Sequence, residues 1–109
     1  MTTKEQLNIG GYDFKVYRPK KYSMAKEDAL RLMHKFGYSS IYTAYDRPSS
    51  AKVAIYNDWY DWGVENGIYL RITSRNTFHF SLGGLYTAED GTEYYLAITA
   101  CNLTATVLS

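Results

Sequence analysis

Two histidines, one cysteine and scattered carboxylates are the side chains of this sequence that could take part in catalysis. His34 falls in a predicted helix and His79 alternates with two phenylalanines, and neither has a carboxylate at a spacing that would form a proton-transfer pair. Cys101 has no second thiol and no activating partner. The sequence contains no nucleophile elbow, phosphate loop or HExxH zinc motif. It therefore predicts a protein that is not an enzyme and that uses no metal or cofactor.

Aromatic side chains are the more informative group. The chain has 109 residues, of which 12 are tyrosine and two are tryptophan. A domain of this size buries only part of so many rings, so the remainder should lie at the surface, where Tyr, Trp and Arg contribute most of the energy of protein interfaces. The sequence predicts a binding module. Its predicted partner-binding residues are Tyr45, Arg47, Trp59, Tyr60, Trp62, Arg71 and Arg75.

Two parts of this set have a predicted arrangement. Trp59 and Trp62 stand three residues apart, so on a single helical turn they share one face, either as a lid over one end of the core or as an anchor for another protein. The polar turns around Arg47 and Arg75 meet at one edge of the sheet if their strands pair. Both guanidinium groups would then lie beside Tyr45 and could bind carboxylates or phosphates.

A short basic and aromatic cluster gives the alternative, a small nucleic-acid-binding protein. Aromatic rings beside cationic side chains bind single-stranded nucleic acids. However, 12 basic and 11 acidic residues leave a formal charge of only +1, which argues against binding through bulk charge. Direct contact with nucleic acid is therefore the less favoured interpretation. Its predicted residues are Tyr17, Arg18, Lys20 and Lys21, with Arg71 added from the sheet.

The elements that position these residues follow from the hydrophobic periods. One amphipathic helix is predicted over 24–36, capped by Ser23 and ended by Gly37, as the only long helix. Strands are predicted at 12–18, 39–45, 51–56, 68–73, 78–86, 93–99 and 103–108, with a connection at 57–67, a bulge or bend at Gly83-Gly84 and a hairpin turn at Asp90-Gly91. The expected fold is α+β, with one amphipathic helix packed on a twisted, mostly antiparallel sheet of about five to seven strands. Residues 1–109 are expected to form a single domain.

The location expected for this chain is the cytoplasm, without membrane contact. The first residues lack the apolar stretch of a signal peptide, and no run approaches the roughly 18 apolar residues of a membrane span. The single cysteine also fits a reducing compartment.

Two segments resemble blocks found in small phage and mobile-element proteins. Segment 43–54 (TAYDRPSSAKVA) is similar to a SYxTPVA block at the start of a strand, and segment 68–78 (IYLRITSRNTF) to a YSxTTSRHxxxF block, with Asn76 where that group has His. The resemblance implies an accessory or anti-defence protein of the anti-CRISPR kind, acting in the cytoplasm of the host bacterium. It implies a host protein as partner, such as a CRISPR effector nuclease or its ribonucleoprotein complex, inhibited without chemistry. It assigns no site residues.

A third interpretation, a homo-oligomeric structural protein, stays open beside these two. A homodimer is possible, and a stable dimer that buries Trp59 or Trp62 would count against the interpretation with a host partner.

Overall fold

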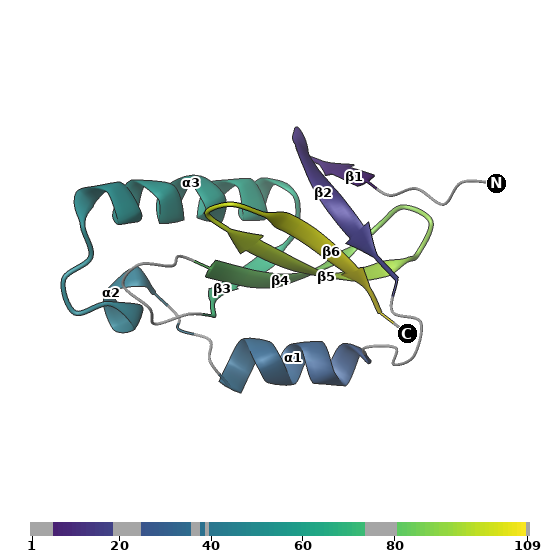
Figure 1. Ribbon diagram of the computed structural model, residues 1–109, viewed down its shortest axis with the longest axis horizontal. Helices are drawn as coiled ribbons and strands as arrows, with labels where there is room; N and C mark the ends of the chain where they lie inside the picture. The colour runs from purple at the N-terminus through teal and green to yellow at the C-terminus, as the bar shows by residue number, and fades with distance from the viewer. Residues whose placement is uncertain (1–5, 19–24, 36–37, 39, 74–80, 109) are drawn as a thin grey trace.

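The fold is a six-stranded sheet with three helices (Figure 1). The computed structural model describes residues 6–18, 25–35, 38, 40–73 and 81–108. In chain order the elements are β1 (Gln6–Ile9), β2 (Tyr12–Tyr17), α1 (Lys26–Lys35), α2 (Ile41–Ala44), α3 (Ser50–Glu65), β3 (Tyr69–Ile72), β4 (Ser81–Thr87), β5 (Glu93–Thr99) and β6 (Leu103–Val107). The strand order is β1-β2-β6-β5-β4-β3, and every pair is antiparallel except β2 with β6. The predicted α+β class is confirmed.

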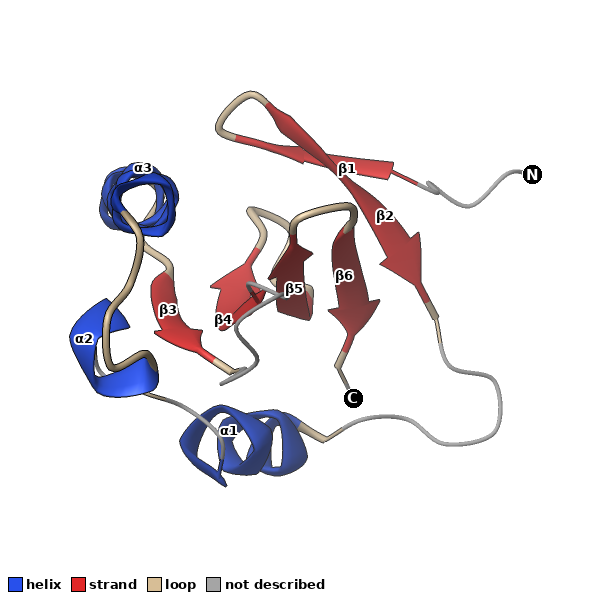
Figure 2. Ribbon diagram, turned by 60° about the vertical axis from the view of Figure 1, so that its left-hand side comes forward, coloured by secondary structure: helices blue, strands red, loops and turns tan. Residues whose placement is uncertain are grey.

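Helices lie on both sides of this sheet: α3 above it and α1 below it in Figure 1. The alternation along β5 explains how both faces are used. Tyr94, Leu96 and Ile98 are buried in the main core, on the side of α3. Glu93 points the other way, and its carboxylate pairs with Lys26 of α1 at 3.2 Å. Figure 2 shows the β1–β2 hairpin reaching beyond β6 toward α3, so that it closes one end of the core.

Two helices replace strands that were predicted: α2 lies within 39–45, and α3 covers 51–56 and most of the predicted connection at 57–67. These predictions are wrong, as is the prediction of a single long helix. Residues 41–44 form the short helix α2 instead. Ser49 caps α3, and its hydroxyl accepts a hydrogen bond from the Lys52 amide at 3.2 Å. Apolar residues occur on several sides of α3, which hides the 3.6-residue period and leaves an accidental alternation at 51–56.

The remaining strand predictions agree with the structure where it describes the chain. Strand β5 has the predicted bounds, and β2, β3 and β6 lie within theirs. The described part of the predicted strand 78–86 belongs to β4, while β1 was not predicted. Helix α1 is confirmed with Ala29 and Met33 on its buried side. The predicted cap Ser23 and the predicted stop Gly37 lie outside the described residues.

Two glycine predictions have different outcomes. The hairpin turn at Asp90-Gly91 is confirmed: Gly91 has φ of 90°, and the Asp90 carboxylate accepts a hydrogen bond from the Thr92 amide at 2.9 Å. The bulge at Gly83-Gly84 is wrong, because β4 pairs with β5 in unbroken register. Space explains a glycine there instead, since a Cβ on Gly84 would lie 2.7 Å from a methyl group of Leu70.

Candidate protein-binding surface

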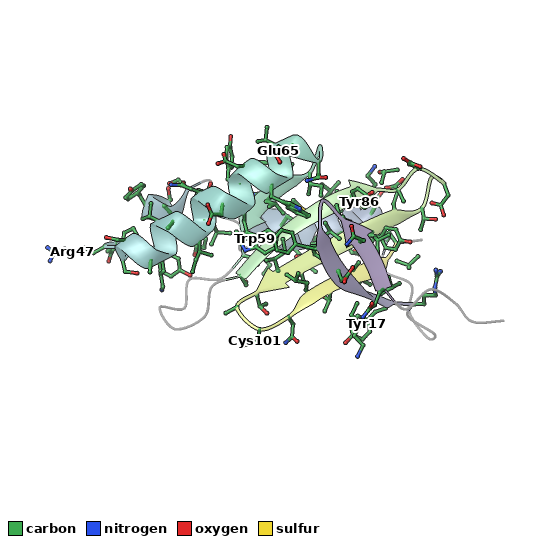
Figure 3. The ribbon with its side chains drawn as sticks, turned by 90° about the horizontal axis from the view of Figure 1, so that it is seen from above. Tyr17, Arg47, Trp59, Glu65, Tyr86 and Cys101 are labelled. Carbon is green, nitrogen blue, oxygen red and sulfur yellow. The ribbon has the colours of Figure 1, made fainter. Side chains whose placement is uncertain are left out.

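The two tryptophans join α3 to the β1–β2 hairpin. Trp62 is buried, stacks on Phe14 with ring centroids 5.7 Å apart, and donates a hydrogen bond from its indole nitrogen to the Ile9 carbonyl at 3.2 Å. Trp59, labelled in Figure 3, is half-buried. Its ring centroid lies 4.7 Å from that of Tyr12 and 5.2 Å from that of Trp62. Trp59 and Trp62 share one face of a helix, as predicted, but that helix is the 16-residue α3 rather than a single turn. This geometry supports the lid role for Trp62 and leaves part of the Trp59 ring at the surface.

The predicted residues Tyr45 and Arg47 lie in the segment between α2 and α3. Tyr45 is buried, so desolvation raises the pKa of its phenol above the ordinary 10.0. The ammonium of Lys52 lies 4.0 Å from the centre of the Tyr45 ring. Arg47 is exposed at the edge of an open cleft of 790 Å³. The cleft is lined by Tyr45, Asp46, Arg47, Pro48, Ser49 and Lys52.

A second hollow, of 320 Å³, opens between the last turns of α3 and the edge strand β3. We name it the tyrosine hollow. Its rim is formed by Tyr60, Val64 and Tyr69, which remain 52%, 64% and 61% exposed. Exposed apolar side chains of this size around a concavity are typical of an interaction site. Its lining residues are Tyr60, Gly63, Val64, Gly67, Ile68, Tyr69 and Leu70.

Behind the rim, Tyr56 joins the tyrosines of α3 and β3 into one group. Its ring centroid lies 6.0 Å from that of Tyr60. Burial raises the pKa of the Tyr56 phenol, and the neighbouring phenols of Tyr60 and Tyr69 raise it further. The Tyr56 hydroxyl therefore stays protonated at neutral pH and can act as a hydrogen-bond donor.

Arg71 gives the hollow a charged neighbour. Its guanidinium donates a hydrogen bond to the Tyr69 hydroxyl at 2.9 Å and lies 5.9 Å from the centre of the Tyr69 ring. This contact fixes the orientation of an exposed tyrosine, so less rotational freedom would be lost when a partner binds it. Arg71 thus lies beside Tyr69, as part of one surface with Tyr60.

The structure separates the other predicted residues along α3. Tyr45 and Arg47 precede the helix, whereas Trp59, Tyr60 and Trp62 lie in its second half, so the set does not form one patch. The predicted meeting of Arg47 with Arg75 falls outside the described residues, because they end at 73 and resume at 81.

The structure separates the predicted nucleic-acid cluster: Tyr17 ends β2 and Arg18 follows it, whereas Arg71 lies on β3, at the far edge of the strand order. Tyr17 and Arg18 are exposed, and the Lys15 ammonium lies 5.3 Å from the centre of the Tyr17 ring. Lys20 and Lys21 are outside the described residues.

Val64 and Tyr69 were not predicted as contact residues. Tyr69 alternates with Ile68 and Leu70, which already placed it on the side of the strand opposite two apolar residues. Val64 follows Tyr60 by four residues, a spacing that becomes informative only once α3 is known to be a helix.

No cluster of three or more His, Cys, Asp or Glu side chains suited to a metal occurs among the described residues. Within the same residues, no helix is both long and apolar enough to cross a membrane. Comparison with protein-family models, curated proteins and solved structures finds no match for this chain.

Proposed function

We propose that this chain is a phage or mobile-element protein that binds a host protein through the tyrosine hollow and inhibits it without chemistry. The observation that carries the proposal is the exposed rim of Tyr60, Val64 and Tyr69 around an apolar concavity. Burying such rings on a partner contributes area at little cost in side-chain entropy, which is why tyrosine recurs at interface hot spots.

The nature of the partner is argued from the lining. Apolar side chains and phenols line the tyrosine hollow, and the guanidinium of Arg71 beside it donates a hydrogen bond to Tyr69. Such a surface fits an apolar or aromatic side chain of a protein surrounded by polar groups. The class of partner, a bacterial defence nuclease such as a CRISPR effector, comes from the resemblance of segments 43–54 and 68–78 to phage and mobile-element proteins. Inhibition would then follow from covering a functional surface of the nuclease.

A capture experiment tests the proposal. The tagged chain is incubated with lysate of a bacterium that carries an active CRISPR system, and retained proteins are identified by mass spectrometry. We expect a defence nuclease to be retained, and its cleavage activity to fall as the chain is added. The variant Y60A/Y69A should lose both effects, because it removes the two rings of the rim.

Tyr17→Ala is the matched control. Tyr17 is an exposed tyrosine (45%) on β2, away from the tyrosine hollow, so its loss should leave capture unchanged. Capture that survives Y60A/Y69A but is lost in Y17A would contradict the proposed surface. Capture of no defence protein by the unchanged chain would contradict the proposed function.

A nucleic-acid-binding function is the second candidate, because Tyr17 and Arg18 are exposed and Lys15 lies against the Tyr17 ring. Salt separates the two functions. Binding to phosphates weakens steeply as salt rises, whereas an aromatic contact with a protein changes little. Titrating a fluorescent oligonucleotide at low and high salt measures this directly.

A further inference from the structure

Residues along one side of α3 recur with the spacing of a coiled coil. Ser50, Val53, Asn57, Tyr60 and Val64 follow each other at intervals of 3, 4, 3 and 4 residues. We name this row the α3 stripe. It spans about 21 Å at the rise of an α-helix. All five side chains are exposed except Val53, which is half-buried. Trp59 and Trp62 contact the core from another side of α3, and within the α3 stripe Val53 also packs against the core. The other four residues of the α3 stripe are exposed and form a second face of the same helix.

The two ends of the α3 stripe have complementary shapes. Near its C-terminal end, Tyr60 and Val64 protrude beside the tyrosine hollow. Near its N-terminal end, a hollow of 410 Å³ opens between α2 and α3. That hollow is lined by Tyr42, Pro48, Ser50, Val53, Ala54 and Asn57.

An antiparallel pair of α3 helices, centred on Asn57, would match these ends. In that arrangement Tyr60 of one copy lies opposite Ala54 of the other and can enter the hollow between α2 and α3. Asn57 meets its counterpart on the two-fold axis, where each side-chain amide can both donate and accept a hydrogen bond. A polar residue at such a position favours one register over its neighbours.

The charged residues at the two ends of α3 also fit an antiparallel pair of helices. The second half of α3 carries Asp58, Asp61 and Glu65, all exposed, whereas Arg47 precedes the helix. Figure 3 shows Arg47 and Glu65 at opposite ends of α3. The helix has 16 residues and is about 24 Å long, so these two side chains cannot meet within one chain. The antiparallel pair places Glu65 opposite Ser49 of the second copy, within reach of that copy's Arg47.

From this shape and charge we infer that the α3 stripe is a homodimer interface, in which two copies of the chain pair their α3 helices antiparallel about Asn57. A single helix pair gives an interface below the standard size, so the dimer should be weak, with a dissociation constant in the micromolar range or above. Because Tyr60 and Val64 belong to both surfaces, self-association and binding in the tyrosine hollow exclude each other. The inference concerns the isolated chain and stands whether or not a host partner is found.

Sedimentation velocity of the purified chain over about 1–500 µM covers the affinity expected of such an interface. We expect the average mass to rise from monomer toward dimer. Tyr60→Glu should raise the dissociation constant at least tenfold, the loss expected for a central aromatic residue. Ile55→Glu is the matched control, because Ile55 is an exposed apolar residue of α3 outside the α3 stripe, and it should leave the dissociation constant unchanged.

A charge exchange tests the antiparallel order. Arg47→Glu and Glu65→Arg should each raise the dissociation constant roughly three- to tenfold, as expected for two symmetric rim pairs turned repulsive. The double variant R47E/E65R should restore it, and this recovery requires contact between copies. A chain that stays monomeric over the whole range would overturn the inference. A dimer whose dissociation constant is unchanged by Tyr60→Glu would overturn the assigned interface. A dissociation constant for R47E/E65R as high as those of the two single variants would overturn it as well.

Discussion

Replacing Trp62 tests how the fold holds the helix that carries the proposed surface. Its side chain is only 7% exposed, stacks on Phe14 and donates a hydrogen bond to the Ile9 carbonyl. Trp62→Ala removes these contacts and leaves a cavity between α3 and the β1–β2 hairpin, which costs about 3–5 kcal/mol in comparable cores. Domains of this size have a free energy of unfolding of about 5–15 kcal/mol, so this change removes a large share of it.

Trp62→Phe separates the contribution of the hydrogen bond from that of the ring packing. It keeps a ring against Phe14 but removes the indole donor, so we expect a loss of about 1–2 kcal/mol, consisting of one hydrogen bond and part of the packing. Urea unfolding followed by far-UV circular dichroism measures both variants, because a fluorescence readout would change with the tryptophan itself. Tyr60→Ala is the control and should stay within about 0.5 kcal/mol of the unchanged chain. A loss below about 1 kcal/mol for Trp62→Ala would show that this ring does not hold the β1–β2 hairpin to α3.

Three further predictions concern stability. Ser49→Ala removes the N-cap of α3 and should lower the free energy of unfolding by about 1 kcal/mol in urea titrations; no change would show that the cap is dispensable. Gly84→Ala places a methyl group 2.7 Å from Leu70 and should cost about 1–3 kcal/mol, again in urea, whereas an unchanged midpoint would contradict the close packing. Burial raises the pKa of three phenols above 10.0, so each stabilises the fold fully below pH 10 and loses that contribution as pH rises through its folded pKa. The urea concentration at the unfolding midpoint should therefore decrease as the pH rises from about 9 to about 11. An absorbance titration near 295 nm should show the phenols ionising at higher pH in the folded chain than in the urea-unfolded chain. Titrations that coincide would contradict the raised pKa values. These phenols are Tyr45, Tyr56 and Tyr95.

The sheet was predictable because its strands alternate cleanly. Tyr94, Leu96 and Ile98 point to the core and their neighbours point away, so β5 has the period of a half-buried strand. Helix α3 was not predictable in the same way. Its second half has Trp59 and Trp62 toward the core and Tyr60 and Val64 toward solvent, so apolar residues do not mark one side. Only the cap formed by Ser49 and the alanines that follow favour a helix, and these are weak signals beside β-branched and aromatic neighbours.

The candidate site was predictable only in its residue types. Surplus tyrosines did indicate exposed rings, and Tyr60 is one of them. Which rings are exposed depends on tertiary packing: Tyr45 is covered by the start of α3, while Tyr69 stays open at the edge of the sheet. Arg71 was expected beside aromatic rings, but its hydrogen bond to Tyr69 follows from their positions on the same side of β3, two residues apart.

Hydroxyl-radical footprinting of the chain with its captured host partner tests most directly whether the tyrosine hollow is the binding surface. The method reads the solvent exposure of individual side chains, before and after the partner is added. We expect Tyr60 and Tyr69 to lose reactivity in the complex, while Tyr17 keeps its reactivity. Undiminished reactivity of Tyr60 and Tyr69, together with protection of Tyr17, would contradict it.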